Sequence, residues 1–144
     1  MYKSILVPVD IADSAVALPA IEAARGFLQG SDARLRLVTV LSLIPSTFMD
    51  YVPPDFDALQ RQRAEDALRD IATKTGVPPQ QVSTVVRMGG VYPEVLAEAD
   101  DWKADLVIIG SHRPAMSTYL LGSNAATIVR HATCSVLVVR GPKS

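Results

Sequence analysis

The stretch Ser4-Ile5-Leu6-Val7-Pro8-Val9-Asp10 decides the fold, because an aliphatic run of strand length ends there in a proline and then an acid. A run that is apolar on both faces is typical of a parallel strand covered by helices on each side. We expect this first strand to span Ser4–Val9. Four further runs of strand length follow, at residues 34–41, 82–88, 104–109 and 135–140.

Amphipathic segments of helix length separate the five runs. Helices are predicted at residues 13–30, 55–74, 92–102 and 123–132. Pro19 lies within the first of them and either belongs to its first turn or kinks it. The alternation of strand and helix predicts an α/β fold: an open, doubly wound, five-stranded parallel sheet with helices on both faces, of the Rossmann-like kind.

Length and composition describe one globular unit. A chain of 144 residues fits a single domain, residues 1–144, and 49% hydrophobic with 20% charged residues excludes a disordered chain. Fourteen Lys and Arg against fifteen Asp and Glu leave a formal charge of −1. Because nucleic-acid binding needs a basic surface, this balance argues against a nucleic-acid partner.

Nothing in the sequence indicates a membrane or secretory protein. No apolar run approaches the roughly 18 residues of a membrane-spanning helix. The start of the chain meets an acid at Asp10 after a short apolar stretch, unlike a signal peptide. A single cysteine, Cys134, excludes an intrachain disulfide. We therefore expect a cytoplasmic protein without membrane insertion.

The end of the first strand is the first candidate binding region. In open α/β sheets, ligands bind beyond the carboxyl ends of the strands, where the strand order reverses. Pro8 cannot donate a ladder hydrogen bond, so pairing is expected to stop there and free the backbone around Pro8 and Val9. Asp10 then projects at the mouth of the sheet, where its carboxylate suits a ribose hydroxyl. Capping of the following segment explains Asp10 equally well, and both readings stay open.

A second candidate region lies between residues 110 and 124. Gly110 closes the fourth strand, and a polar loop follows that contains Ser111, His112 and Arg113. The last predicted helix is opened by Gly122, Ser123 and Asn124. A glycine lets the backbone approach a bulky anion, the first amides of a helix attract phosphate, and an arginine adds a fork of donors. The alternative is a serine N-cap after a flexible glycine.

Other kinds of site find little support in the sequence. It contains neither a P-loop nor Gly-x-Gly-x-x-Gly, and no serine stands on a Gly-x-Ser-x-Gly elbow. His112, His131 and Cys134 are too sparse for structural zinc. A phospho-receiver domain would need an Asp at the end of the third strand, where Arg87-Met88 stand. We predict no metal site and no catalytic residue.

Three blocks together resemble the universal stress protein family, and most closely its small F/G-type bacterial members. They are Ile5 to Asp10, Ser111 to Asn124, and Val129 to Arg140. Nucleotide-binding members carry Gly-x2-Gly-x9-Gly-Ser/Thr. Here Gly110 and Gly122-Ser123 match, whereas Arg113 replaces the second glycine and the last gap has eight residues. F/G-type members share this Arg-Pro variant and are regarded as ATP binders.

The resemblance implies a site for ATP or another adenine nucleotide, with Mg2+ as a companion of the phosphates left open. Asp10, next to Pro8 and Val9, would meet ribose or adenine, and Val40 would contact adenine through its backbone. The residues lining ribose and phosphates would be Gly110, Ser111, His112 and Arg113. The phosphates themselves would be bound by Gly122, Ser123 and Asn124.

The resemblance also implies a homodimer formed through the last strand. An exposed edge made of Val136, Leu137, Val138 and Val139 would invite pairing, and pairing with a second copy would close it. A short edge tolerated as it is, or capped by residues 140–142, is the alternative.

The function expected from all this is a stress-response regulatory switch. Bound phosphates would order the loop of residues 111–121 and change the surface that the dimer presents to a regulatory protein partner, whose identity the sequence leaves unknown. Two alternatives are a nucleotide-free protein–protein adaptor of the same fold and a slow ATP hydrolase. No general base is identifiable, so we do not predict a true enzyme.

Overall fold

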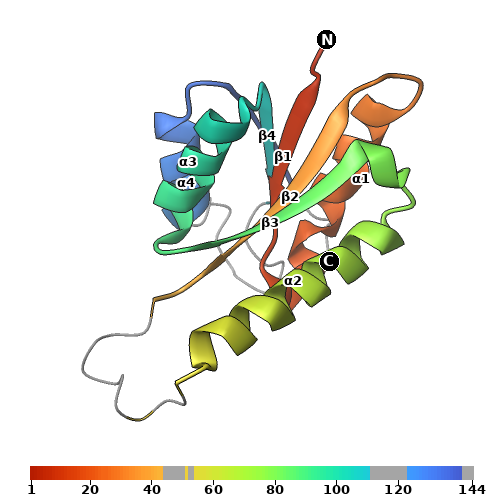
Figure 1. Ribbon diagram of the computed structural model, residues 1–144. Coiled ribbons are helices and arrows are strands. Elements are labelled where there is room, and N and C mark those ends of the chain that lie inside the picture. Colours follow the sequence, from red (N-terminus) through yellow and green to blue (C-terminus); the bar gives the residue numbers. More distant parts are fainter. Residues whose placement is uncertain (44–50, 52–53, 111–122, 141–144) are drawn as a thin grey trace.

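A five-stranded parallel sheet with the order β3-β2-β1-β4-β5 forms the centre of the computed structural model (Figure 1). The structure describes residues 1–43, 51, 54–110 and 123–140. The strands are β1 (Ser4–Pro8), β2 (Arg34–Leu41), β3 (Val82–Met88), β4 (Leu106–Gly110) and β5 (Ser135–Val139). The predicted doubly wound α/β fold is confirmed.

Helices cover both faces of the sheet, as predicted. They are α1 (Leu18–Leu28), α2 (Phe56–Lys74), α3 (Val91–Trp102) and α4 (Ser123–His131), with short 3-10 helices η1 (Ile11–Ala17) and η3 (Pro79–Gln81). In Figure 1, α3 and α4 lie side by side on one face and α1 and α2 lie on the other.

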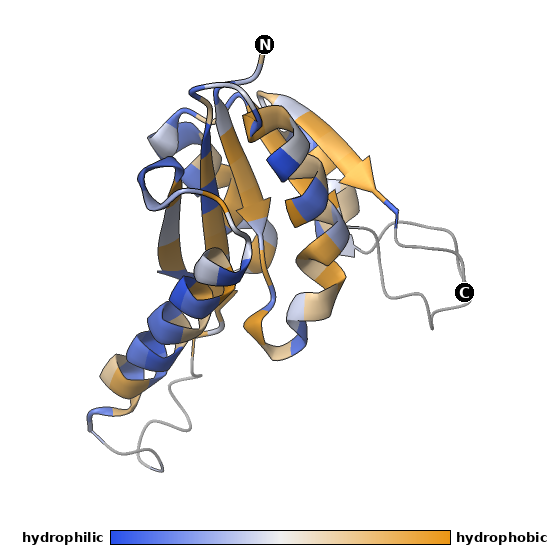
Figure 2. Ribbon diagram, turned by 90° about the vertical axis from the view of Figure 1, so that its right-hand side faces the viewer, coloured by the Kyte–Doolittle hydropathy of each residue, from blue (hydrophilic) through white to orange (hydrophobic). Residues whose placement is uncertain are grey.

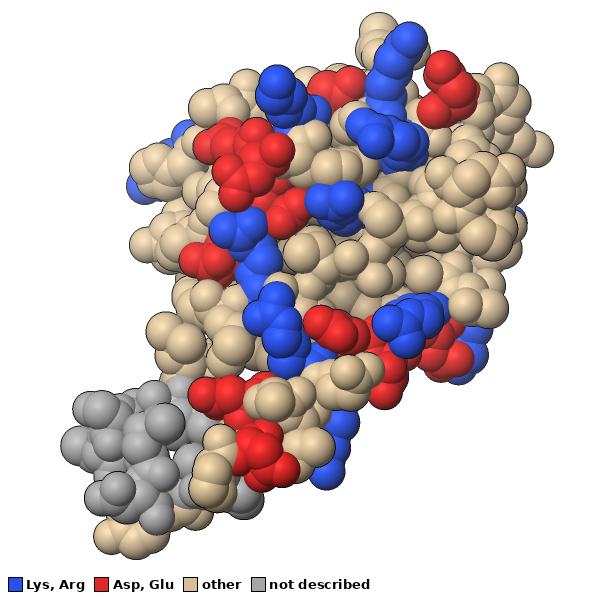
Figure 3. Space-filling model, viewed as in Figure 1, with Lys and Arg blue, Asp and Glu red and all other residues tan. Residues whose placement is uncertain are grey.

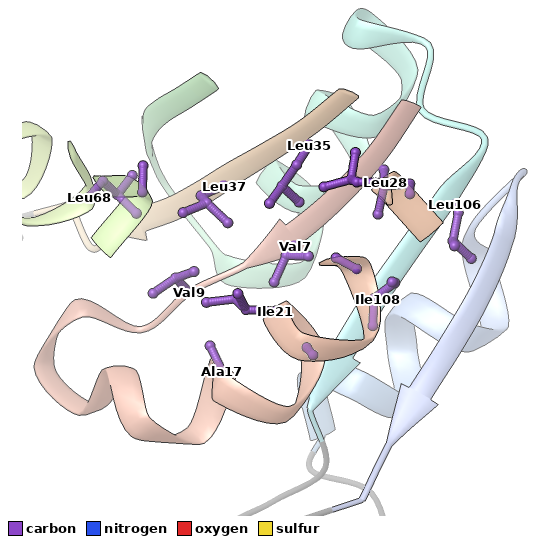
Figure 4. Close-up of a cluster of buried hydrophobic side chains, with 14 of the residues drawn as sticks. Val7, Val9, Ala17, Ile21, Leu28, Leu35, Leu37, Leu68, Leu106 and Ile108 are labelled. Carbon is purple, nitrogen blue, oxygen red and sulfur yellow. The ribbon is translucent and has the colours of Figure 1, made fainter. Parts of the chain in front are cut away.

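Each face has its own hydrophobic core. On the α1/α2 face, alternate residues of β1 and β2, such as Val7 and Leu37, pack against Ile21 of α1 and Leu68 of α2 (Figure 4). On the opposite face the intervening residues meet α3 and α4; there Leu6, Val38, Val95, Val107 and Ile128 are almost fully buried. Burial of strands on both faces explains the continuous apolar runs of the sequence.

The beginning of the first helical segment differs from the prediction of one helix. Asp10 accepts a hydrogen bond from the Ala12 backbone at 3.0 Å and starts η1, and the backbone kinks at Asp13. A separate helix, α1, begins at Leu18. Pro19 therefore lies in the first turn of α1, where its missing N–H costs nothing.

The two halves of the sheet are joined by a short seam. β1 pairs with β2 from Ser4 to Pro8, but with β4 only through Ile5–Leu106 and Leu6–Val107. Beyond Leu6 the strands β1 and β4 have no ladder pairs, and this is also where the strand order reverses. The carboxyl ends of β1 and β4 thus leave room between them.

Candidate functional site

A cavity of about 460 Å³ opens at the carboxyl ends of β1 and β4. Its walls come from β1, η1, β2, α3, β4 and α4, which are far apart in the sequence. The lining residues are Pro8, Val9, Asp10, Val16, Ala17, Val38, Val40, Ser42, Val91, Val95, Ile109, Gly110, Asn124, Ala125 and Ile128. Concave sites of this size, mostly apolar with a few polar groups, are typical of small-molecule binding.

One side of the cavity is apolar. Val38 and Val40 are alternate residues of β2 and present their side chains to the same face of the sheet. Val91 and Val95 face them from the first turns of α3, and Ile109 adds the end of β4. These side chains offer no hydrogen bonds, so they suit the flat face of an aromatic ring.

Polar groups stand at the rim and the opposite side. Asp10 lines the cavity and is solvent-exposed, and its hydrogen bond to Ala12 occupies Oδ1. A carboxylate has two oxygens with several acceptor positions, so Asp10 can cap η1 and still accept a hydroxyl. Both readings of Asp10 from the sequence are therefore compatible with the structure. Ser42 and Asn124 supply the other polar side chains.

Gly110 has a structural reason to be glycine in addition to its place in the cavity wall. A Cβ atom at this position would lie 2.7 Å from the carbonyl oxygen of Val16. The backbone of η1 therefore crosses directly over the end of β4. This close approach brings η1 and β4, two walls of the cavity, into contact.

The N-terminus of α4 reaches the cavity with Asn124, and Ala125 and Ile128 of the same helix also line it. Ser123 is the exposed first residue of this helix, and its carbonyl accepts a hydrogen bond from Thr127 Oγ1 at 2.8 Å. The free amides at a helix start carry partial positive charge and favour an anion.

Six of the predicted nucleotide-binding residues line this one cavity: Pro8, Val9, Asp10, Val40, Gly110 and Asn124. Ser123 neighbours it at the start of α4. Ser111, His112, Arg113 and Gly122 lie outside the described residues. The sequence reasoning missed Val38 and Ser42, which a period of two around Val40 could have indicated, and Val91 and Val95, which no local pattern identifies.

A group of charged residues ties α3 to the sheet beside the cavity. We call Arg36, Arg87, Glu94 and Glu98 the α3 clamp. Glu98 is 4% exposed and accepts hydrogen bonds from both arginines at 2.9 Å, and Glu94 accepts one from Arg87 at 2.9 Å. Hydrogen bonding to Glu94 raises the pKa of Arg87 above its ordinary value, although partial burial acts in the opposite direction. Figure 3 shows acidic and basic side chains interleaved where α3 meets the sheet.

The indole ring of Trp102 extends this arrangement toward the amino end of β2. The guanidinium carbons of Arg34 and Arg36 lie 5.4 and 4.8 Å from its ring centre. Both distances fall within the range of a cation–π interaction.

The β5 edge of the sheet is apolar, and no described strand pairs with its outer side. Figure 2 shows β5 as a largely hydrophobic strand at one margin of the sheet. Val136, Val138 and Val139 are half-buried and Leu137 is 36% exposed. The strand lies at the edge of the sheet, so one row of its backbone groups faces outward.

Two further findings concern metal and membrane. Within the part of the chain that the structure describes, no three His, Cys, Asp or Glu residues gather into a metal-binding group. Over the same residues, none of the helices combines the length and the apolar character needed to span a bilayer.

An open parallel sheet with a cavity at the reversal of its strand order defines the class of doubly wound α/β domains. Within this class, the model of the universal stress protein family matches residues 1–140, and the chain belongs to that family. Universal stress protein G of Shigella flexneri is 36% identical over 143 residues, covering 97% of this chain and 100% of that protein. The resemblance to F/G-type members is confirmed.

Solved structures agree with this assignment. Universal stress protein UspA from Lactobacillus plantarum has a TM-score of 0.77 at 25% identity, covering 96% of this chain and 98% of that chain. A universal stress protein in complex with cAMP has a TM-score of 0.61 at 27% identity, covering 96% of each chain.

Proposed function

We propose that the cavity binds ATP or another adenine nucleotide and that the protein acts as a stress-response regulatory switch. The observation that carries the proposal is the cavity itself, with an apolar side formed by β2 and α3 and a carboxylate and a helix start at its rim. Membership of the universal stress protein family and the relative in complex with cAMP support it.

The lining suggests an orientation for the nucleotide. The adenine ring would lie between Val40 of β2 and the two valines of α3, Val91 and Val95. The ribose would meet the free oxygen of Asp10, and the phosphates would extend toward Ser123 and Asn124 at the start of α4. In this orientation the phosphates would lie at the start of α4, and the switch that we propose is a change in the surface presented to a partner when phosphate is bound.

Calorimetry with a cavity-filling variant tests the site. Wild-type protein is titrated with ATP, AMP and adenosine, and ligands extracted from freshly purified protein are identified by mass spectrometry. Val40→Phe places a ring in the base position and should weaken each ligand by at least about tenfold, which corresponds to ~1.4 kcal/mol. Val77→Phe makes the same change at a half-buried valine that follows α2, outside the cavity lining, and should bind as wild type.

The outcomes separate the rival functions. Wild-type protein that carries no nucleotide and binds none of the three ligands would reject the proposal and leave the adaptor reading. Release of phosphate from ATP well above the rate of the Val40→Phe variant would instead favour an ATP hydrolase.

We also propose that the protein is a homodimer paired through β5, because that edge is apolar and no described strand pairs with its outer side. Sedimentation of wild-type protein should give the mass of two chains. Leu137→Glu should give one chain, because a charge would then stand in the interface. Leu59→Glu changes a similarly exposed leucine on α2 and should stay dimeric. A wild-type monomer at tens of micromolar would rule the dimer out.

A further inference from the structure

Arg87 lies one strand away from the cavity. It is the register partner of Val40 in the β2–β3 ladder. Side chains of parallel partners point to the same face of a sheet, so the Arg87 side chain lies beside that of Val40. Val40 lines the cavity, whereas Arg87 does not. Arg87 is therefore adjacent to the base position without being part of its surface.

The guanidinium of Arg87 extends from β3 to α3. Its Nε donates to Glu94 Oε1 at 2.9 Å, and its Nη1 donates to Glu98 Oε1 at 2.9 Å and to Asp101 Oδ2 at 3.4 Å. The other oxygen of Glu98 accepts from Arg36 Nη1 at 2.9 Å. One strand residue thus contacts three successive turns of the helix, and its two contacts at 2.9 Å have the length of the stronger, charge-assisted hydrogen bonds in proteins.

The part of α3 that Arg87 contacts first is also a wall of the cavity. Glu94 lies in the first turn of α3, between the lining residues Val91 and Val95. A shift of the Glu94 backbone therefore moves both valines. Val95 is fully buried, whereas Val91 is 40% exposed. Packing alone therefore holds Val91 only weakly.

The turn that leads into α3 packs against Glu94, the residue that Arg87 contacts. Gly89 has φ +140°, and a Cβ atom there would lie 3.1 Å from Cγ of Glu94. The Gly89 backbone N–H donates to the Leu41 carbonyl at 2.8 Å, next to Val40 and Ser42 in the chain. The Glu94 side chain thus packs over a glycine that is itself bound to the strand lining the cavity.

We propose that Arg87 is a positioning residue of the binding site: through Glu94 and Glu98 it sets the distance between the α3 wall and Val40. The identity of the ligand in this inference rests on the proposed nucleotide function. The contacts of the α3 clamp do not depend on it. Without Arg87, α3 samples positions in which Val91 and Val95 stand away from the base. Apparent affinity falls in proportion to the fraction of molecules that remain competent.

The experiment compares adenosine with ATP in Arg87→Met. Because α3 contacts only the base end of the proposed ligand, both ligands should lose affinity by the same factor, about tenfold if one molecule in ten stays competent. Arg87→Lys keeps the charge but can hold one carboxylate at a time, so it should restore part of the loss. A general loss of stability would also weaken both ligands by one factor, so hydrogen exchange, in which α1 should not change, distinguishes the two causes.

The matched control is Arg61→Met. Arg61 also holds the end of β3, since its Nη2 donates to the Val86 carbonyl at 3.1 Å, but it does so from α2 on the opposite face. It should bind both ligands as wild type. Arg87→Met that binds adenosine as wild type overturns the proposal, and so does a loss confined to ATP, which would mean a long-range effect of charge on the phosphates.

Hydrogen exchange tests the clamp without any ligand. In Arg87→Met, amides 94–98 should exchange faster than in wild type, whereas amides of α1 should not change. Unchanged exchange in α3 overturns the proposal even if nucleotide binds. If wild-type protein binds neither ligand, the nucleotide proposal fails while faster exchange still supports the clamp. Should Arg87→Met not fold, Glu94→Gln, which removes one charge from the clamp, is measured in its place.

Discussion

The two halves of the sheet are built differently, although they meet at the same cavity. In the β3-β2-β1 half, β2 and β3 pair along seven residues, and partly buried arginine–glutamate contacts hold a helix over them. In the β4-β5 half, the edge strand has five residues and offers half-buried aliphatic side chains to its surroundings. One half is held together by charges within the chain, whereas the other ends in an apolar edge strand, which we propose a second copy of the chain covers.

The largest loss of stability is expected when the contacts between Glu98 and the two arginines are removed. Glu98→Ala removes the buried carboxylate and leaves Arg36 and Arg87 without their shared acceptor. Breaking a buried ion pair on one side costs about 3 kcal/mol or more of unfolding free energy. Urea unfolding followed by circular dichroism measures it.

Glu65→Ala is the control for that change, because it breaks a solvent-exposed pair with Arg61. Exposed pairs contribute at most about 1 kcal/mol, so this variant should unfold close to wild type. If both variants lost the same unfolding free energy, the α3 clamp would stabilise the β3 half no more than an exposed ion pair does.

A smaller loss is expected in the β4 half from Gly110→Ala. The new methyl group would meet the Val16 carbonyl, and relief requires the backbone of η1 or β4 to move. Overpacking of this kind costs about 1–3 kcal/mol. Thermal unfolding with and without nucleotide would show the loss and a weaker stabilisation by ligand.

Gly26→Ala should change the unfolding free energy in the opposite direction from Gly110→Ala. Gly26 lies inside α1 with nothing within 4 Å of the new Cβ, and alanine favours the helix by about 1 kcal/mol. A neutral Gly110→Ala would contradict the close packing at the end of β4, and a destabilised Gly26→Ala would contradict the open space beside α1.

The smallest effect concerns Cys134, immediately before β5. Burial raises the pKa of its thiol above the ordinary value. The raised value means that folding favours the neutral thiol, so this stabilisation is complete below the unfolded pKa of about 8.5 and is lost as pH rises through the folded value. Unfolding free energies of wild type and Cys134→Ala, compared from pH 7 to 10, should converge toward alkaline pH.

Alkylation gives a second measure of the same thiol. At pH 8, iodoacetamide should react with Cys134 in folded protein more slowly than with the unfolded chain, because thiolate is the reactive form. Equal rates would show that the start of β5 opens freely.

Secondary structure was predictable where an apolar run is flanked on both sides by turn-forming residues. The second and third strands have the expected limits, and the fourth and fifth differ by one or two residues. The first helix was predicted as one element because local periodicity does not show that Asp10 starts a separate 3-10 segment. That division depends on how the chain leaves β1, which tertiary packing decides.

The candidate site was predictable from strand ends but not from helix faces. Pro8, Asp10 and Gly110 follow from where strands stop, and a parallel sheet brings such positions to one edge, whereas Val40 was predicted only through the family resemblance. Which face of α3 looks into the cavity depends on the angle at which it crosses the sheet. The pairing of Arg87 with Glu94 and Glu98 likewise joins two elements whose relative placement no local pattern contains.

The chain's one tryptophan, Trp102, is the last residue of α3, whose other end carries Val91 at the cavity. The two positions are eleven residues apart in sequence, about 16 Å along the helix axis. Indole emission responds to nearby charge, and two guanidinium groups lie against this ring. A tilt of α3 on ligand entry would change that stacking, so the unlabelled protein contains an intrinsic fluorescent reporter on a helix that forms one wall of its cavity.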